Sequence, residues 1–391
     1  MTASDPKRWA CVARMGGFGD NLIASSVFPG LKKRYGNLEV ITSPLMCSLY
    51  ENNPHNDKLS VREDGDPPWG DGHSWQAWFA SRAREYAFFV NLSHSVEATG
   101  VALKVQTQYW WPVEFRRKLF GRSYLELVHD ICGIPYDEIA PQFFPTDAEV
   151  ERARETKRKV GERVIGWMLA GSRIDKWHPE LDVAVARALR ELRVPIILFG
   201  GPGKDLELAK LIESEVKKRN RSTEGLHFAI SESQGEPLWP PRRVCSQVQQ
   251  CDVIVGPDTG PMWAVAMGEM PKLLMVSHAS PENISKHWRN TTTLHADPQR
   301  VPCWPCHRLH DDASTCVPNA DRNGAACISD ISVDTIVSEI GRLLKELEDG
   351  SNQRVHAKGD VGLVPGRGGA DASLDAGDRS VVRFPHQYER L

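Results

Sequence analysis

Short apolar runs alternate along the chain with longer stretches in which apolar residues recur at helical spacing. The first pattern predicts buried strands and the second predicts amphipathic helices. Strands are expected at 9–14, 39–42, 88–92, 164–169, 194–199, 253–255 and 272–276, and helices at 21–35, 179–192, 203–218 and 333–347. This alternation predicts parallel sheets wrapped by helices, in which ligands bind at the carboxyl ends of the strands.

Interruptions of this pattern divide the chain. A charged stretch with little strand character at 145–161 predicts a boundary between an N-terminal domain, residues 1–155, and a C-terminal domain, residues 156–349. Over 350–391 glycine, aspartate and serine replace the periodic pattern, which predicts a flexible tail. Residues 63–78 are rich in Gly, Pro, Asp and Trp and are expected to form a long loop.

The overall charge excludes one class of binding. The 391 residues include 48 Lys and Arg and 51 Asp and Glu, so the formal net charge is -3. No global positive field therefore draws the chain to nucleic acid or to an anionic membrane. No apolar run approaches the roughly 18 to 20 residues that span a bilayer, and the first residues lack the apolar core of a secretory signal. We expect a cytoplasmic location, either free or peripheral to a membrane.

A glycine-rich turn follows the first expected strand. It contains Gly16, Gly17 and Gly19 and is followed by Asp20. Its spacing matches neither a Walker A loop nor a dinucleotide fingerprint, which argues against an NTPase and a dehydrogenase. Asp20 is suited both to cap the next helix and to face a ligand at the strand end. A second backbone-exposing turn, at 256–261, follows the strand at 253–255.

An ordered series of motifs resembles glycosyltransferase family nine, the ADP-heptose lipopolysaccharide heptosyltransferases and their relatives. The motifs lie at 16–35, 40–44, 50–54, 166–172, 176–179, 198–202 and 256–262, and the resemblance runs from about residue 10 to residue 344. It implies an α/β fold of the GT-B type, with two Rossmann-like domains facing across a cleft. The acceptor would bind mostly to the N-terminal domain and the nucleotide sugar to the C-terminal domain.

The resemblance also implies a reaction. It is that of an inverting, metal-independent glycosyltransferase, which moves a sugar such as heptose from a nucleoside-diphosphate donor, an ADP-sugar in this family, to an acceptor hydroxyl. Such transfer needs a base for the hydroxyl and positive or dipolar groups for the departing diphosphate, but no cofactor. The acceptor implied is a glycolipid. A protein or modified DNA acceptor is one alternative, and a sugar-nucleotide binding protein without turnover is another.

The site residues follow position by position from the motifs. Asp20 matches the family's general base, and Lys176 matches the lysine that contacts the donor phosphates. The remaining donor-site residues implied by the match are Gly17, Gly19, Ser172, Asp258, Thr259, Gly260, Pro261 and Met262. Helix N-termini favour anions, which fits a diphosphate at the second turn. Trp263 departs from the family, which usually has a histidine there, and leaves the donor's identity open.

An aromatic and basic segment at 104–124 is the candidate for acceptor recognition. It combines six aromatic residues with five positive charges against Glu114 alone, a local charge sum of five minus one, or +4. Aromatic rings beside arginines suit a sugar, an anionic lipid headgroup or a single-stranded nucleic acid. An amphipathic helix with buried rings and solvated charges explains the same pattern.

Four of the nine cysteines gather late in the chain. They are Cys303, Cys306, Cys316 and Cys327. A CxxC turn can aim two thiolates at one ion, and the heptosyltransferases that modify bacterial autotransporters carry a similar four-cysteine iron-binding finger near this point. We therefore expect a structural zinc or iron bound at 303–327. The chain is also a candidate for oligomer formation. Two disulfides or unpaired thiols are the alternatives, and His307 or His310 could replace one cysteine.

Overall fold

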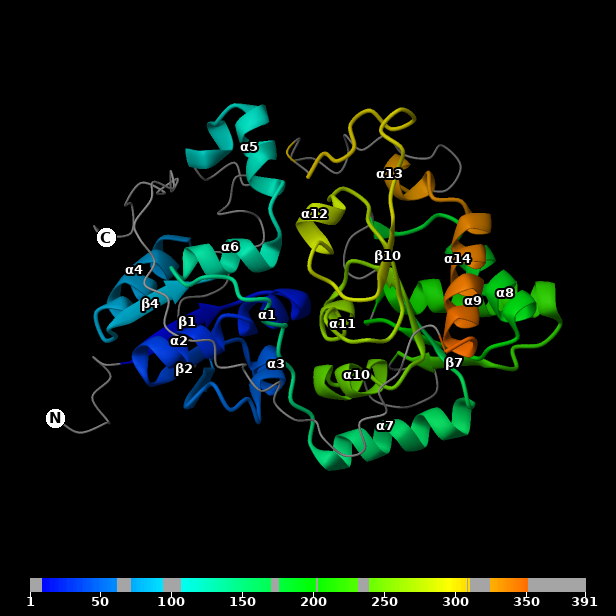
Figure 1. Cartoon of the computed structure of the whole chain (residues 1–391), viewed down its shortest axis with the longest axis horizontal. Coiled ribbons are helices and arrows are strands. Elements are labelled where there is room, and N and C mark those ends of the chain that lie inside the picture. The colour runs from blue at the N-terminus through cyan, green and yellow to red at the C-terminus, as the bar shows by residue number, and fades with distance from the viewer. Residues whose placement is uncertain are drawn as a thin grey trace.

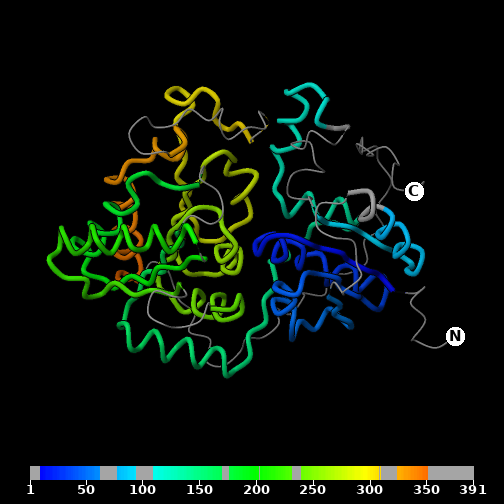
Figure 2. Tube along the Cα trace, turned by 180° about the vertical axis from the view of Figure 1, so that it is seen from behind, coloured from blue at the N-terminus to red at the C-terminus, as the bar shows by residue number. Residues whose placement is uncertain are grey.

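The computed structural model describes residues 9–61, 72–93, 107–169, 176–201, 203–230, 239–307, 309 and 324–350. Two lobes lie side by side, and helix α7 (Asp147–Val160) runs beneath the second lobe (Figure 1). Each lobe is built around one parallel sheet, as the alternating pattern predicts. The division is equally plain from behind (Figure 2).

The N-terminal sheet has the strand order β3-β2-β1-β4, and every neighbouring pair is parallel. Its strands are β1 (Ala10–Arg14), β2 (Leu38–Thr42), β3 (Lys58–Val61) and β4 (Phe88–Asn91). Every residue of β1 and β2 is buried, as is typical of the central strands of a parallel sheet, whereas the edge strand β3 is partly exposed. The chain turns to opposite sides of β1, so a topological switch point lies between β1 and β4.

The C-terminal sheet has the order β10-β9-β8-β5-β6-β7 and is also parallel throughout. Its strands are β5 (Ile165–Met168), β6 (Ile196–Phe199), β7 (Leu226–Ala229), β8 (Val253–Pro257), β9 (Lys272–Met275) and β10 (Thr291–Leu294). The strand order reverses between β5 and β8. Ligands of open α/β sheets bind outside the carboxyl ends of strands at such a reversal.

Helices connect the strands of both sheets. In the first lobe they are α1 (Phe18–Ser25), α2 (Phe28–Tyr35), α3 (Pro44–Cys47), α4 (Gly72–Ala83), α5 (Val113–Phe120) and α6 (Tyr124–Ile131), with short 3-10 helices at Ser48–Tyr50 and Thr107–Trp110. In the second they are α8 (Leu181–Leu192), α9 (Lys204–Asn220), α10 (Pro241–Val248), α11 (Gly260–Trp263), α12 (Pro281–Ile284), α13 (Ala326–Ser329) and α14 (Val333–Glu348). The boundary expected near residue 155 falls inside α7, which packs on α10.

The lobes touch where α1 meets α11. A Cβ atom built on Gly260 would lie 2.6 Å from the Cβ of Phe18, and one on Gly19 would lie 3.0 Å from Cδ1 of Trp263. Real Cβ atoms essentially never approach within 3.0 Å, so position 260 needs glycine, whereas a side chain at position 19 would require Trp263 to move by a few tenths of an ångström. One apolar cluster continues through the contact, from Leu22 of α1 to Met262 of α11. The glycines of the two turns therefore bring the two strand ends together.

A single arginine joins the lobes at a second point. Arg242 of α10 is buried and donates from Nη1 to the carbonyls of Ser48 and Glu51, at 2.9 and 3.2 Å. Its Nη2 reaches the Phe144 carbonyl at 2.8 Å, and Nη2 and Nε bond the two oxygens of Glu149 at 2.6 Å each. Both lobes and the segment between them therefore share one guanidinium.

Three sequence expectations differ from the observed elements. The helix expected over 21–35 is two helices, because Pro29 cannot donate the hydrogen bond that would continue the first one. Part of the loop expected at 63–78 is helix α4. The edge strands β3, β7 and β10 escaped notice, since each is short and carries polar residues that weaken the apolar signal.

Candidate functional site

The first half of the candidate site is the turn between β1 and α1. Asp20 lies in the first turn of α1, where its Oδ2 accepts a hydrogen bond from the backbone N–H of Gly17 at 3.0 Å. Oδ2 also pairs with Nη2 of Arg14 at 3.0 Å; the Asp20 side chain is 29% exposed and that of Arg14 only 3%. The buried Arg14 guanidinium thus holds the Asp20 carboxylate at the surface, and Gly17 contributes its backbone N–H.

The buried side-chain amide of Asn21 fixes the conformation of this turn. Asn21 Nδ2 donates to the Gly17 carbonyl at 2.8 Å. Its Oδ1 accepts from the hydroxyls of Thr42 at 2.8 Å and Tyr50 at 2.9 Å, so the amide's orientation is set by β2 and the short helix that follows. Such a satisfied buried network makes a rigid support. Arg14 and Asn21 were not among the sequence candidates, although both flank the glycine turn.

The second half lies at the carboxyl ends of β5 and β8, the reversal point of the larger sheet. Lys176 Nζ pairs with Oδ2 of Asp258 at 3.0 Å and also bonds the Asp258 carbonyl. Oδ1 of Asp258 accepts from Nε1 of Trp263 at 2.8 Å. Burial alone would raise the pKa of Asp258, but the Lys176 charge and the bonds from Lys176 and Trp263 together hold it below its usual value. Lys176 and Asp258, predicted separately, therefore form one unit.

The other predicted donor residues divide into two groups. Thr259 is the N-cap residue of α11, and its buried Oγ1 has no hydrogen-bond partner among the described residues, which suits it to bind a ligand oxygen. Pro261 occupies the first turn of α11. Met262 is fully buried in the core, and Gly19 and Gly260 form the lobe contact, so the structure gives these three a packing role. Ser172 lies outside the described residues.

The sequence analysis also missed His278, which lies near the turn at 256–261, called the donor loop below. His278 follows β9, and its charge acts on Asp258. Its Nδ1 lies 3.1 Å from Oγ of Ser277, and its carbonyl accepts from the backbone of His307 at 2.8 Å. The available signal was its place two residues beyond an expected strand, at the edge where ligands bind.

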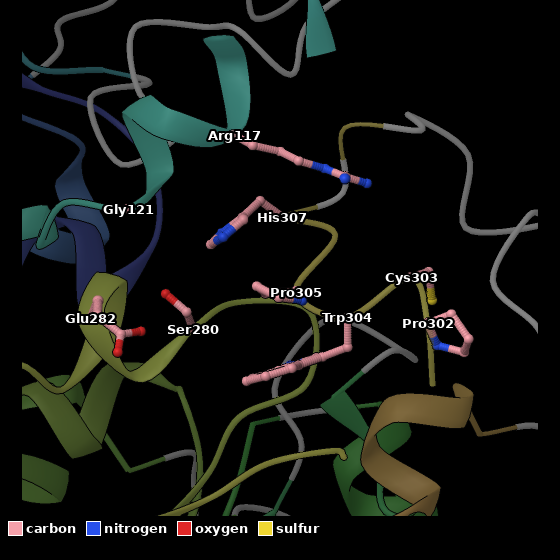
Figure 3. Close-up of a pocket in the computed structure, with 9 residues that line it drawn as sticks. All are labelled: Arg117, Gly121, Ser280, Glu282, Pro302, Cys303, Trp304, Pro305 and His307. Atoms are coloured by element: carbon pink, nitrogen blue, oxygen red, sulfur yellow. The ribbon is translucent and has the colours of Figure 1, made fainter. Parts of the chain in front are cut away.

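A cavity of about 380 Å³ lies between the two lobes, on the α5 side. It is lined by Arg117, Gly121, Ser280, Glu282, Pro302, Cys303, Trp304, Pro305 and His307. Arg117 reaches from α5 toward the opposite loop, and His307 lies below it (Figure 3). Burial, with His278 and Arg117 adding to it, lowers the pKa of His307 to about 3, so the ring is neutral and stacks on Phe120.

The aromatic and basic segment is mixed in character where the structure describes it. Trp110 and Phe115 are exposed, at 74% and 43%, whereas Phe120 is buried. Arg116 is buried and bonds the Trp111 carbonyl, while Arg117 lines the cavity. Some rings of this segment are therefore buried and others are exposed, and its part in acceptor recognition stays a prediction.

The structure describes three of the four cysteines that are predicted to bind a metal. Cys303 is exposed and Cys306 and Cys327 are buried, while Cys316 and His310 lie outside the described residues. Arg300 pairs with Asp330 at 2.6 Å and so ties the loop before Cys303 to the end of α13, which carries Cys327. Within the described ranges, no group of three or more His, Cys, Asp or Glu side chains could hold a metal ion. The metal site stays a prediction.

Comparisons with known proteins agree with this architecture. No protein-family model and no curated protein matches the chain. Among solved structures, a glycosyltransferase of family 9 from Veillonella parvula superposes with a TM-score of 0.60 at 15% identity, over 88% of this chain and 99% of that one. ADP-heptose lipopolysaccharide heptosyltransferase II of E. coli gives 0.56 at 16% identity, over 87% and 99%.

A third similar structure carries a metal and a donor. It is the dodecameric, iron-containing heptosyltransferase TibC, from enterotoxigenic E. coli, in complex with ADP-D-beta-D-heptose; the TM-score is 0.53 at 14% identity, over 88% of this chain and 77% of that one. At these identities the likeness establishes the fold, and the chain adopts the two-domain, Rossmann-like GT-B arrangement of these glycosyltransferases.

Among the helices that the structure describes, none combines the length and the apolar character that a membrane span needs.

Proposed function

We propose that this protein is an inverting glycosyltransferase that moves a sugar from a nucleoside diphosphate to an acceptor hydroxyl. One observation carries the proposal: the Gly19–Gly260 contact brings the carboxylate turn of one lobe against the donor loop of the other. Asp20 then lies on the acceptor side, and Lys176 with Thr259 on the diphosphate side. The motifs that match family nine fall on these loops, and the fold is that of its solved members.

In this mechanism Asp20 takes the proton of the acceptor hydroxyl as the oxygen attacks the anomeric carbon. The bond from that carbon to the diphosphate breaks on the opposite face, so the configuration inverts. Lys176 and the backbone N–H groups at the start of α11 stabilise the negative charge that grows on the leaving diphosphate. Arg14 holds the Asp20 carboxylate in place without blocking it, since the pair uses Oδ2. We propose that no divalent cation takes part.

The proposed donor is an ADP-sugar, with ADP-heptose the first to test. TibC, which shares this fold, is described with ADP-D-beta-D-heptose bound. We place a glycolipid or other macromolecular acceptor beside α5, because the cavity between the lobes opens there and Arg117 lines it. Arg117→Ala should raise the acceptor KM and leave the donor KM unchanged.

Donor turnover tests the proposal directly. The purified chain would be incubated with ADP-heptose and a panel of UDP-, GDP- and other ADP-sugars, with and without EDTA, and release of the nucleoside diphosphate measured. We expect ADP release from one donor, at a rate unaffected by EDTA. Binding of nucleotide sugars without release, in the presence of candidate acceptors, would favour the non-catalytic alternative. A strict magnesium requirement would overturn the metal-independent step.

A further inference from the structure

Trp263 occupies a position between the two halves of the site. The side chain is only 2% exposed, and its indole N–H points to Asp258 Oδ1 at 2.8 Å. Its Cδ1 edge lies against Gly19, the residue before Asp20 in the chain. The family resemblance gives no role to a tryptophan here, since it has a histidine at this position.

The two oxygens of Asp258 have separate partners. Oδ1 accepts the hydrogen bond from the Trp263 indole, and Oδ2 pairs with the Lys176 ammonium at 3.0 Å. The Lys176 side chain is 17% exposed, so it lies at the surface of the site with its direction set by Asp258. A carboxylate bonded at only one oxygen is free to rotate about its terminal torsion, which has a broad minimum. The indole N–H removes that freedom.

We propose that Trp263 is a positioning residue, which locks the Asp258 carboxylate so that it presents Lys176 to the donor diphosphate. This inference rests on the proposed function for its consequence in catalysis, but not for its effect on Lys176. Indole is a donor only and does not titrate, so the lock holds at every pH at which Asp258 is ionised. A histidine in its place would donate from Nδ1 or Nε2 according to its tautomer and protonation state.

Neighbouring rings offer a matched control. Trp263 packs edge to face with Trp288, with ring centroids 4.9 Å apart. Trp288 is likewise buried, at 7% exposure, yet its Nε1 has no hydrogen-bond partner among the described residues. Trp263→Phe and Trp288→Phe therefore remove the same atoms from one aromatic cluster. Only the first also removes a hydrogen bond to Asp258.

The first test measures Lys176 without any substrate. Each variant would be labelled with a limiting amount of acetic anhydride, and the acetylation of Lys176 quantified by mass spectrometry against exposed lysines of the same chain. We expect Trp263→Phe to change the labelling of Lys176 severalfold and Trp288→Phe to leave it at the wild-type level. Equal labelling in all three proteins would overturn the inference, whether or not the chain transfers sugar.

The second test measures ADP binding by calorimetry. Trp263→Phe should weaken it roughly tenfold, the lower end of the loss expected for a hydrogen bond to a charged group. In a Lys176→Ala background the same change should have no further effect, because the two act in series. Additive losses would mark Trp263 as purely structural. Wild-type protein that binds no nucleoside diphosphate would contradict the proposed function and leave the labelling result standing.

Trp263→His adds a signature that packing alone cannot give. The imidazole can donate to Asp258 and should restore part of the ADP affinity lost in Trp263→Phe. The ADP phosphate titrates in the same range, and His278 and Lys176 also act on Asp258, but these groups are common to both proteins. The affinity of Trp263→His divided by that of the wild type should therefore follow a pH profile with a midpoint near the ordinary histidine pKa of about 6.5. Should Trp263→Phe not fold, Trp263→His carries the test. A flat pH profile of this ratio, at the Trp263→Phe level, would count against the inference.

Discussion

The two turns that meet at the lobe contact look alike in sequence but are held in different ways. In the first, Asp20 is fixed by Gly17 and by Arg14, all within seven residues of one another in the chain. In the second, Asp258 depends on Lys176, which is 82 positions away and follows a different strand. The base side of the site is thus a local structure, and the donor side exists only once the second sheet has formed.

Because the two turns are held differently, substitutions in them should have different effects. A change in the first turn should alter the chemistry and leave ligand binding and folding in place. A change in the second should alter binding and chemistry together, because Lys176 contacts charge that is present in both ground and transition states.

Asp20→Asn should give the largest loss. The amide oxygen can still accept from Gly17, so the turn keeps its shape while the base is lost, and kcat should fall roughly 10²–10⁴-fold. ADP affinity should stay at the wild-type level. Asp130→Asn, on an exposed ion pair with Arg122, is the control and should leave kcat unchanged. Residual activity above about one tenth in Asp20→Asn would remove Asp20 from its proposed role.

The pairing of Arg242 with Glu149, at the second contact between the lobes, should weaken in acid. Hydrogen bonds from Arg242 outweigh burial and lower the pKa of Glu149 from 4.5 to about 2. Because the folded pKa is the lower one, the stabilisation is complete above about pH 4.5 and is lost as the pH falls toward 2. Glu149→Gln should therefore cost on the order of 3 kcal/mol at pH 7 and almost nothing near pH 2. Urea unfolding at several pH values would measure this, and a cost that does not vary with pH would contradict it.

Lys176→Ala should weaken ADP binding about 10- to 100-fold and slow transfer as well, from the usual strength of a hydrogen bond to a charged group. Calorimetry and donor kinetics together would show it. The paired loss is what separates this side of the site from Asp20. If donor KM and kcat are both unchanged, Lys176 is a surface residue and the comparison fails.

Adding a methyl group at the lobe contact should have a smaller effect, of about 1–3 kcal/mol in the free energy of unfolding. Gly260→Ala should cost more than Gly19→Ala, because its Cβ would overlap the Cβ and Cγ of Phe18 at 2.6 Å, whereas the second meets Trp263 at 3.0 Å. Thermal unfolding of the two variants is the measurement. The reverse order would mean that the lobes can shift apart at α1.

Loss of metal should affect neither turn. We expect roughly one zinc or iron per chain in protein purified without chelator, bound by Cys303, Cys306, Cys316 and Cys327. Cys306→Ser should lower the metal content and the unfolding temperature but leave ADP affinity unchanged, since four protein ligands leave no open position. Elemental analysis is the measurement. Fully stable, metal-free protein would exclude the site.

The sequence predicted what local patterns determine. Strong apolar runs placed the central strands of both sheets, and the glycine turn after β1 placed Asp20. The pairing of Lys176 with Asp258 could not be read from spacing, because it depends on β5 and β8 being neighbours in the sheet. The resemblance brought in Lys176 as a phosphate contact and Asp258 as a donor-site residue, and the structure shows that Asp258 pairs with the lysine. Arg242 gave no local signal at all, since its four hydrogen-bond partners lie in other segments.

Arg242 also bears on attempts to divide this protein. A chain cut between residues 132 and 143 and expressed as two fragments would leave the Ser48 and Glu51 carbonyls in one piece and the guanidinium with its other acceptors in the second. Each fragment would expose the apolar surface around α1 or α11 that the intact protein covers. Fragments made this way should aggregate alone and recover only when co-expressed, so complementation is the practical route to labelling one lobe at a time.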